Sequence, residues 1–431
     1  MMMQNRMTAY TLLLTQGLSL IGSRMTGIAI GIWLFQTTGK TTYLLLVPFF
    51  NEIPTLLIGN ICGVYIDRWK RKTSLVIGDV GQAVGSLLLL ISIALNIFKP
   101  WMLYSAVLLQ GIFSMLQGAA ADTTMTLLIT EANRERINGI KEMLFPAAGV
   151  IAPMLTALAY PLVGIKGIIT MDLITFLIAI IILTKLDIPN PKGNISVEGS
   201  NDSLKSDLKT GYRFLKDHKL LFGLILYFSF TNFLLNGPLE LVIPYVMQLT
   251  ESEVAVSMML SVMSIGTFCG AMTIAVLGRI GLRMHIILGA MIINGLMLIV
   301  FGIVRTPITL GISLFFLMMP LPIVSALFKS ILQIKVPADL QGRVFSISYQ
   351  IAYGSAPLSF LLVGPLVDNI LEPKMQSGMW PWLTNIFGEI AGAGMGLALS
   401  CAGVIIIATT IAFSLCRNFR RLESKLPDYK Y

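Results

Sequence analysis

Charged and polar side chains are scarce in this sequence of 431 residues. Only 12% of the residues are charged, whereas 55% are hydrophobic and the mean hydropathy is +0.80. A soluble globular protein of this length needs more polar side chains to cover its surface. The composition therefore excludes a water-soluble fold and favours a protein embedded in the lipid bilayer.

Cysteine and histidine are also rare. The four cysteines lie in or at the ends of apolar runs and form no CxxC pair, which argues against a disulfide framework. The two histidines, His218 and His285, stand apart at the ends of apolar runs, so we expect no metal site. No motif in the sequence predicts a cofactor.

Long apolar runs fill most of the chain. A membrane-spanning helix needs about 20 apolar residues, and the runs that reach this length are separated mostly by short polar turns. We therefore expect an all-α membrane protein with twelve transmembrane helices, near residues 9–35, 44–66, 73–95, 102–126, 141–163, 166–184, 220–247, 254–277, 285–304, 307–328, 345–370 and 387–415.

The formal net charge of +9 does not indicate a nucleic-acid partner, because Lys and Arg are distributed among short loops. Most of them fall in the loops that share a side with both chain termini. The positive-inside rule assigns such a side to the cytoplasm. We expect a multi-pass protein with both termini in the cytoplasm and the lipid bilayer as its surroundings.

One long polar segment divides the spans into six and six. It covers residues 185–219 and begins with the Pro, Gly, Asn and Ser content of a linker, and residues 202–216 are expected to form a short amphipathic helix. The expected domains are an N-terminal bundle at 1–184 and a C-terminal bundle with its tail at 220–431. Paired bundles of this kind are typical of transporters that bind substrate between the two halves.

Short sequence motifs recur in both halves of the chain, as an internal duplication requires. GVYIDRWKRK, residues 63–72, follows the second span, and the weaker counterpart GRIGLR, residues 278–283, follows the eighth. Asn138-Gly139 before the fifth span is echoed by Gln341-Gly342-Arg343 before the eleventh. The repeats favour two pseudo-symmetric six-helix bundles.

The stretch GVYIDRWKRK also carries a family pattern. Gly63 is followed four residues later by Asp67 and Arg68, and then by the basic residues Arg71 and Lys72. In this register it resembles the signature loop of the major facilitator superfamily, and the whole chain resembles the macrolide-efflux-like and siderophore- or peptide-exporter-like branch. The resemblance implies a monomeric transporter of the bacterial inner membrane.

For the loop itself, the resemblance implies a gate whose Asp67 contacts the opposite half when the cytoplasmic side is closed. Charge-assisted hydrogen bonds of Asp67, Arg68 and Arg71 could form in one state and break in the other. The alternative is a solvated turn whose cations only set the topology.

Charges inside the expected spans need a partner or a function, because each costs roughly 2.5 to 3.5 kcal/mol near the bilayer centre. Arg24 in the first span, Glu52 in the second and Glu240 in the seventh fall at similar depth. The resemblance implies that the first and seventh spans line a central cavity. We expect Arg24 to hold one carboxylate ionised while the other carries a proton. A static ion pair that fixes helix packing is the alternative.

Other polar residues in the spans are weaker candidates. Asp79 and Asp172 lie in the third and sixth spans, for which structural pairing or solvation at a helix end is the alternative to proton transfer. Asn51 and Asn236 would add hydrogen-bonding groups to a cavity rich in Met and Phe. Such a lining suits a bulky, amphipathic and mostly apolar small molecule.

These features predict a proton-coupled exporter of a hydrophobic or amphipathic compound that works by alternating access. The resemblance implies that this compound is a macrolide-like drug, a peptide antibiotic or a siderophore. An uptake symporter or a lipid flippase is the alternative within transport. A polytopic enzyme would show a cluster of His, Asp or Glu at one membrane face, and a receptor would add a soluble output domain. Neither feature is visible in the sequence.

Overall fold

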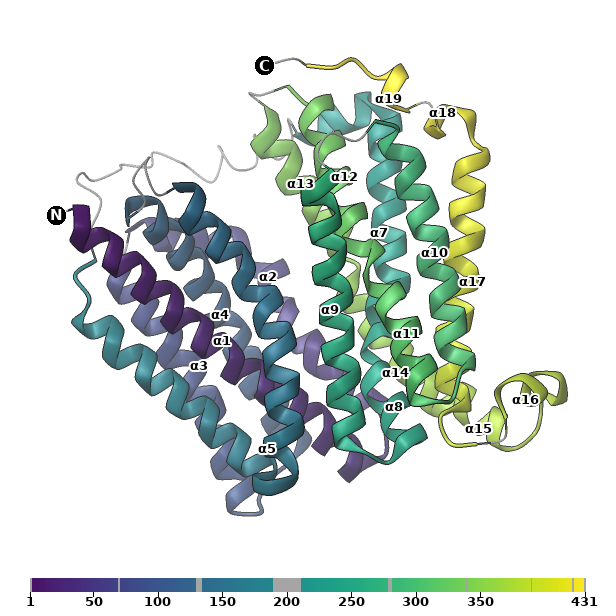
Figure 1. The fold of residues 1–431 in the computed structure, drawn as a ribbon, viewed down its shortest axis with the longest axis horizontal. Helices are drawn as coiled ribbons and strands as arrows, with labels where there is room; N and C mark the ends of the chain where they lie inside the picture. Colours follow the sequence, from purple (N-terminus) through teal and green to yellow (C-terminus); the bar gives the residue numbers. More distant parts are fainter. Residues whose placement is uncertain are drawn as a thin grey trace. The chain divides into compact units, whose positions relative to one another are not determined.

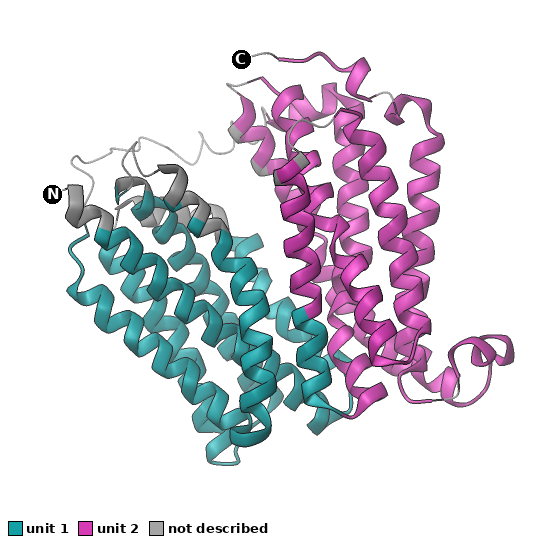
Figure 2. Ribbon diagram, viewed as in Figure 1, with its two compact units in different colours: residues 1–196, 252–261 teal, residues 197–251, 262–431 magenta. Residues whose placement is uncertain are grey.

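The computed structural model describes residues 2–68, 70–128, 134–188, 211–277, 281–337, 340–388, 390–420 and 422–429, and every regular element in these ranges is helical (Figure 1). The chain divides into two compact units (Figure 2). Unit 1 contains residues 1–196 and 252–261, and unit 2 contains residues 197–251 and 262–431.

Unit 1 is a bundle of long helices around a common apolar core. Its elements are α1 (Met2–Thr38), α2 (Thr41–Arg68), α3 (Arg71–Ala94), α4 (Pro100–Leu128), α5 (Arg134–Lys185) and the first residues of α9 (Glu253–Leu277). Helix α1 packs against α5, and α3 packs against both α4 and α5. Leu12, Leu75 and Leu183 are fully buried where these helices meet.

Helix α5 consists of two arms that meet at Gly164. This glycine has φ 61° and ψ −170°, a conformation that residues with a side chain rarely adopt. The backbone therefore changes direction there without a separate loop. The expected spans 141–163 and 166–184 correspond to the two arms, which are two helices separated by the non-helical Gly164.

Unit 2 contains helices that are interrupted more often. Its elements are α7 (Lys219–Glu240), α8 (Val242–Thr250), the rest of α9, α10 (Arg283–Ile303), α11 (Pro307–Met318), α12 (Pro320–Lys335), α13 (Gln341–Tyr353), α14 (Ala356–Leu366), the π-helix η3 (Val367–Leu371), α15 (Glu372–Gln376), α16 (Pro381–Phe387), α17 (Ala393–Leu415), α18 (Arg417–Arg420) and α19 (Leu422–Lys425). Helix α10 packs against α17, α11 and α12, and α7 packs against α13 and α14.

Ten helical runs in the described ranges are long and apolar enough to cross a membrane, where the sequence predicts twelve. The two arms of α5 count as one run, Met143–Lys185. The expected span 44–66 lies in α2, whose side chains are described only to residue 57, too few for it to be counted. Of the amphipathic helix expected at 202–216, only residues 211–216 are described, and these are helical.

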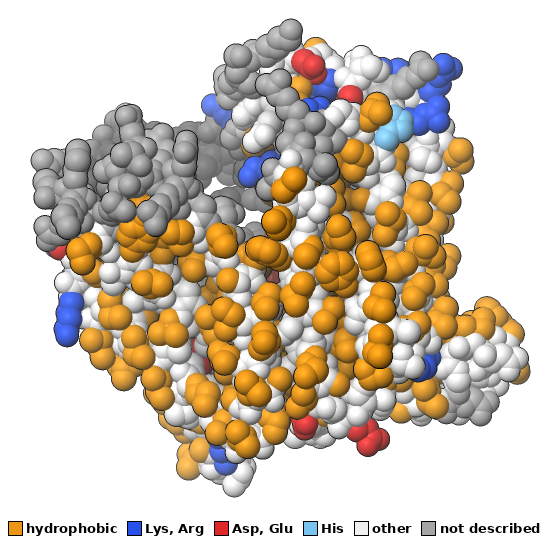
Figure 3. All heavy atoms as spheres, in the orientation of Figure 1, with side chains coloured by type: hydrophobic (Ala, Val, Ile, Leu, Met, Phe, Trp, Pro, Cys, Tyr) orange, Lys and Arg blue, Asp and Glu red, His pale blue; other side chains and the backbone are white. Residues whose placement is uncertain are grey.

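Large apolar side chains cover the sides of the helices (Figure 3). Leu158 and Leu162 on α5, Ile308 on α11 and Leu415 on α17 are each more than two-thirds exposed. Exposed apolar surface on this scale suits contact with lipid chains and not with water. The chain is therefore a multi-pass membrane protein.

Candidate functional site

The stretch 63–72 joins the end of α2 to the start of α3. The side chains of Gly63, Asp67 and Arg68 lie outside the described part of the structure. Arg71 begins α3 and is only 7% exposed. The predicted gating role of these residues therefore stays a prediction.

Lys72 has a defined position in the same stretch. Its Nζ donates hydrogen bonds to the carbonyl oxygens of Thr184, at 2.7 Å, and Leu186, at 2.9 Å. Both carbonyls lie at the C-terminal end of α5, where the helix leaves its last carbonyls without intrahelical donors and where a cation is favourable. Lys72 thus joins the start of α3 to the end of α5 by hydrogen bonds within unit 1.

Replacing Lys72 with methionine is expected to lower the stability of unit 1 by about 1 to 2 kcal/mol, because the two carbonyls lose a charged donor. The measurement is the thermal unfolding midpoint of the purified protein in lipid nanodiscs. Lys70→Met is the matched control, since Lys70 is exposed two residues away. Equal midpoints for both variants would contradict the structural role of Lys72.

Arg24 lies on α1 and is partly buried. Its guanidinium carbon stands 3.8 Å from the centre of the Phe145 ring on α5, a favourable cation–π contact. Asn51 and Glu52 lie on α2 and are exposed. Among the described residues of unit 1, no ion pair joins Arg24 to Glu52.

Glu240 and Asn236 lie on α7 in unit 2 and are half-buried. The amide nitrogen of Asn236 donates to the carbonyl oxygen of Asn232 at 2.7 Å, and Asn232 in turn donates to the carbonyl oxygen of Ala352 at 3.0 Å. Because Arg24 and Glu240 belong to different units, their predicted grouping stays a prediction.

Asp172 is buried within unit 1 at 1% exposure. One carboxylate oxygen accepts from the hydroxyl of Ser23 on α1 at 3.2 Å, and the other accepts from the hydroxyl of Ser86 on α3 at 2.9 Å. The amide nitrogen of Gln110 on α4 donates to the Ser86 hydroxyl at 3.0 Å. The carboxyl group therefore connects α5 directly to α1 and α3, and to α4 through Ser86.

Asp79 on α3 is completely buried. Its Oδ1 accepts from the amide nitrogen of Gln117 on α4, and the amide oxygen of Gln117 accepts from Gln82 at 3.2 Å. Its Oδ2 has no hydrogen-bond partner among the described residues. Asp79 thus belongs to a second polar cluster at the interface of α3 and α4.

The sequence singled out the two aspartates but not the cluster around them. Asp79, Gln82 and Ser86 share a face of α3 because they are three and four residues apart. Gln110 and Gln117 are seven residues apart on α4 and share a face in the same way. Helical spacing of polar residues in two consecutive apolar spans is the signal that would have revealed this interface.

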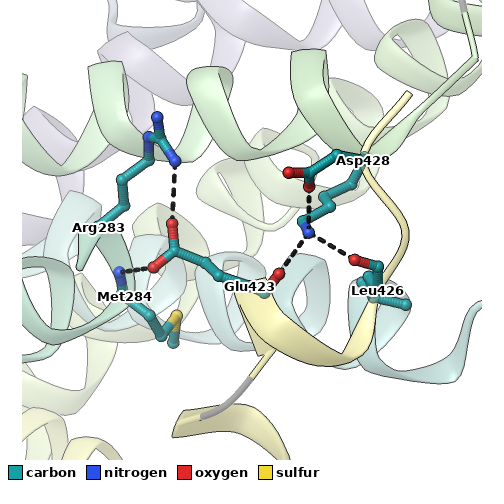
Figure 4. Close-up of polar contacts among 6 residues, drawn as sticks. Arg283, Met284, Glu423, Leu426 and Asp428 are labelled. Carbon is teal, nitrogen blue, oxygen red and sulfur yellow. Dashed lines mark hydrogen bonds and ion pairs between the residues drawn. The ribbon is translucent and has the colours of Figure 1, made fainter. Parts of the chain in front are cut away.

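The C-terminal tail folds back onto the ends of α10 and α12 in unit 2 (Figure 4). The Glu423 side chain pairs with Arg283 at 3.1 Å and accepts from the backbone N–H of Met284 at 3.3 Å. Lys335 is 4% exposed, and its Nζ donates to the Leu426 carbonyl and the Asp428 carboxylate, both at 2.6 Å, and to the Glu423 carbonyl at 2.5 Å. The tail is thereby attached to two helix ends.

Within the described ranges, no group of three or more His, Cys, Asp or Glu side chains could hold a metal ion. The groups around Asp79 and Asp172 are instead hydroxyls, amides and carboxyls. The carboxyls can bind and release protons, and all three kinds of group can form hydrogen bonds.

The sequence matches the family model of the Major Facilitator Superfamily over residues 12–360. It is 23% identical over 424 residues to macrolide efflux protein A of Streptococcus pyogenes, covering 96% of this chain and 97% of the relative. It is also 23% identical over 379 residues to the multidrug efflux pump Tap of Mycobacterium tuberculosis (strain CDC 1551 / Oshkosh), covering 84% and 88%.

Solved structures share the fold at lower sequence identity. A mutant of the nucleoside transporter NupG superposes with a TM-score of 0.75 at 13% identity, covering 94% of this chain and 99% of that one. A bacterial homologue of the iron transporter ferroportin in an inward-facing state has a TM-score of 0.67 at 15% identity, with 94% and 98% covered.

Proposed function

Because the chain belongs to the major facilitator superfamily, we propose that it exports a hydrophobic or amphipathic small molecule from the bacterial cytoplasm, driven by protons. It is a transporter and not an enzyme. The observation that carries the direction of transport is the end-to-end similarity to macrolide efflux protein A, which covers 96% of this chain. The similarity to the pump Tap supports the same direction.

In this proposal the chain crosses the inner membrane twelve times as two pseudo-symmetric bundles, 1–184 and 220–431, joined by the linker 185–219. It acts as a monomer with both termini in the cytoplasm. The two bundles expose the substrate site alternately to each side of the membrane. The loop with Gly63, Asp67 and Arg71 closes the cytoplasmic side in one of the two states.

Arg24 is the residue that we place in the substrate and coupling site together with Glu52 and Glu240. Within the described part of unit 1, its guanidinium group lies over the Phe145 ring and forms no hydrogen bond or ion pair. A cation inside the bilayer is costly without an anion. Arg24 is therefore suited to hold a carboxylate of the protein or a polar group of a substrate during the cycle, with Asn51 and Asn236 as neutral contacts.

The test is drug accumulation in a bacterium that lacks its own efflux pumps. Expression of the chain is expected to reduce accumulation of at least one macrolide or similar amphipathic compound, and a protonophore is expected to abolish the reduction. Arg24→Gln should remove efflux while leaving the amount of protein unchanged, because the side chain stays polar but loses its positive charge.

Lys166→Gln is the matched control, since Lys166 is an exposed cation on α5, and it should keep parental efflux. Higher accumulation in cells that express the chain would show uptake and overturn the proposed direction. Full efflux by Arg24→Gln would remove Arg24 from the site.

A further inference from the structure

Two carboxyl groups lie buried in unit 1 without a cation. Asp79 is 0% exposed and Asp172 is 1% exposed, and neither forms an ion pair within the described ranges. The other titratable side chains described on α1, α3, α4 and α5 are Tyr10, Arg24, Arg71, Lys72, Tyr104, Asp122, Tyr160, Lys166 and Lys185. None of these groups hydrogen-bonds to Asp79 or Asp172 in the described structure.

The two acids belong to two neighbouring hydrogen-bonded groups along α3, which we call together the polar ladder. One group contains Asp79, Gln82 and Gln117, and the other contains Ser86, Gln110 and Asp172. The ladder exists because α3 approaches α4 closely. A Cβ on Gly78 would lie 2.5 Å from Cβ of Gln117, and one on Gly85 would lie 2.6 Å from Cγ of Gln110. Without these glycines the glutamines could not reach the polar groups of α3.

The acids lie at two depths along α3. Asp79 is eight residues after Arg71, the first residue of the helix, which corresponds to about 12 Å along its axis. Ser86, the hydroxyl donor to Asp172, is about 10 Å further along. The acids are therefore separated by about two helical turns, with Gln82 between them.

The hydrogen bonds of the two acids differ in a way that determines whether the neutral or the ionised carboxyl group is favoured. An ionised carboxylate buried without a cation or a full set of donors is strongly disfavoured. Asp79 has one amide donor, and its Oδ2 has none, so the neutral acid suits its surroundings. Asp172 has one hydroxyl donor on each oxygen, so its surroundings support either form better.

We propose that Asp79 and Asp172 are two proton-binding sites of this transporter. At each site a carboxylate oxygen gains an O–H bond by taking a proton from hydronium and later loses that proton to water, and no electrons move. The inference rests on the proposed function only for its link to transport, since proton binding itself is a property of the ladder.

A purely structural ladder would hold the helices together without binding protons. Asp79→Asn and Asp172→Asn separate the two interpretations. Asparagine keeps one oxygen, which can accept from Gln117 at position 79 and from one of the two serines at position 172, but it cannot bind or release a proton in this pH range. The variants therefore keep the size of the side chain and remove the proton-binding group.

The direct test is infrared difference spectroscopy of the purified protein in lipid nanodiscs during a pH titration. We expect the carbonyl band of a protonated carboxyl group at neutral pH, with one component lost in Asp79→Asn and a second component changed in Asp172→Asn. Asp122→Asn is the matched control, because Asp122 is exposed on α4, and it should leave the band unchanged. Spectra of both ladder variants that superpose on the parent would overturn the proposal.

Transport assays in proteoliposomes then test the role of the two acids in coupling separately from the proposed export function. Each ladder variant should lose at least about tenfold of efflux driven by an imposed pH gradient, while exchange of substrate at equal concentrations stays within about twofold of the parent. Parental gradient-driven efflux in both variants would overturn their role in coupling. An intact infrared signature in a parent protein that exports no compound would instead overturn the proposed function alone.

Discussion

Lys335→Met is expected to detach the C-terminal tail and to destabilise unit 2 by about 3 kcal/mol. The Lys335 ammonium group is buried, and all of its hydrogen-bond acceptors belong to the tail, namely the carbonyls of Glu423 and Leu426 and the carboxylate of Asp428. Hydrogen bonds to a charged group contribute about 1.5 to 3 kcal/mol each and are not additive. Asp428 is largely exposed and regains water, which limits the loss.

The measurement combines the thermal unfolding midpoint with limited proteolysis after residue 420. The variant should be cleaved there much faster than the parent. Lys329→Met is the matched control, because Lys329 is an exposed lysine on the same helix, and it should leave the tail protected. An unchanged midpoint and a protected tail in Lys335→Met would show that the tail is held by other contacts.

Asp428→Asn separates the contribution of the negative charge of Asp428 from that of its hydrogen bond to Lys335. It keeps an acceptor for the Lys335 ammonium group but removes the opposite charge, so it should cost less than Lys335→Met. If the double variant is no less stable than Lys335→Met alone, the two residues act through the same interaction.

Gly295→Ala is expected to destabilise the contact between α10 and α17 by about 1 to 3 kcal/mol. A Cβ at this position would lie 2.8 Å from the carbonyl oxygen of Gly403 and 2.7 Å from Cγ1 of Ile407. A Cβ on Gly403 would in turn lie 2.5 Å from the carbonyl oxygen of Gly295. Because backbone meets backbone, neither side can turn away, and the two helices must separate.

Gly289→Ala is the matched control on α10. A Cβ there meets no atom within 4 Å, so the substitution should raise stability slightly through the better helix propensity of alanine. Unfolding midpoints and the yield of folded protein are the measurements. If both variants shifted the midpoint in the same direction, the close approach of α10 and α17 would not limit stability.

The family could be predicted from the sequence because it depends on local patterns. Apolar runs of about 20 residues are needed wherever a helix crosses a bilayer, and the register of Gly63, Asp67 and Arg71 lies within a single loop. The boundary between the spans 141–163 and 166–184 could be predicted for the same reason. It depends on a single glycine, Gly164, whose non-helical backbone separates the two arms of α5.

Charged residues inside the spans could be recognised from the sequence, but their partners could not. Asp79 and Asp172 stand out as charges in apolar runs, yet the contacts of Asp79 with Gln117 and of Asp172 with Ser86 depend on which faces of the helices meet. A single sequence records the rotation of each helix about its axis only weakly, because nearly every face of a membrane helix is apolar.

By itself the sequence determined that this protein is a helical membrane transporter of a recognised superfamily, since composition, run length and a local motif are enough for that. Tertiary packing alone decided that Lys335, one of many basic residues near helix ends, is buried beneath the tail. It also decided that Asp79 and Asp172 each lie in a hydrogen-bonded group along α3. Both results arise from contacts between residues distant in the chain, and their energies depend on burial, which only the folded protein defines.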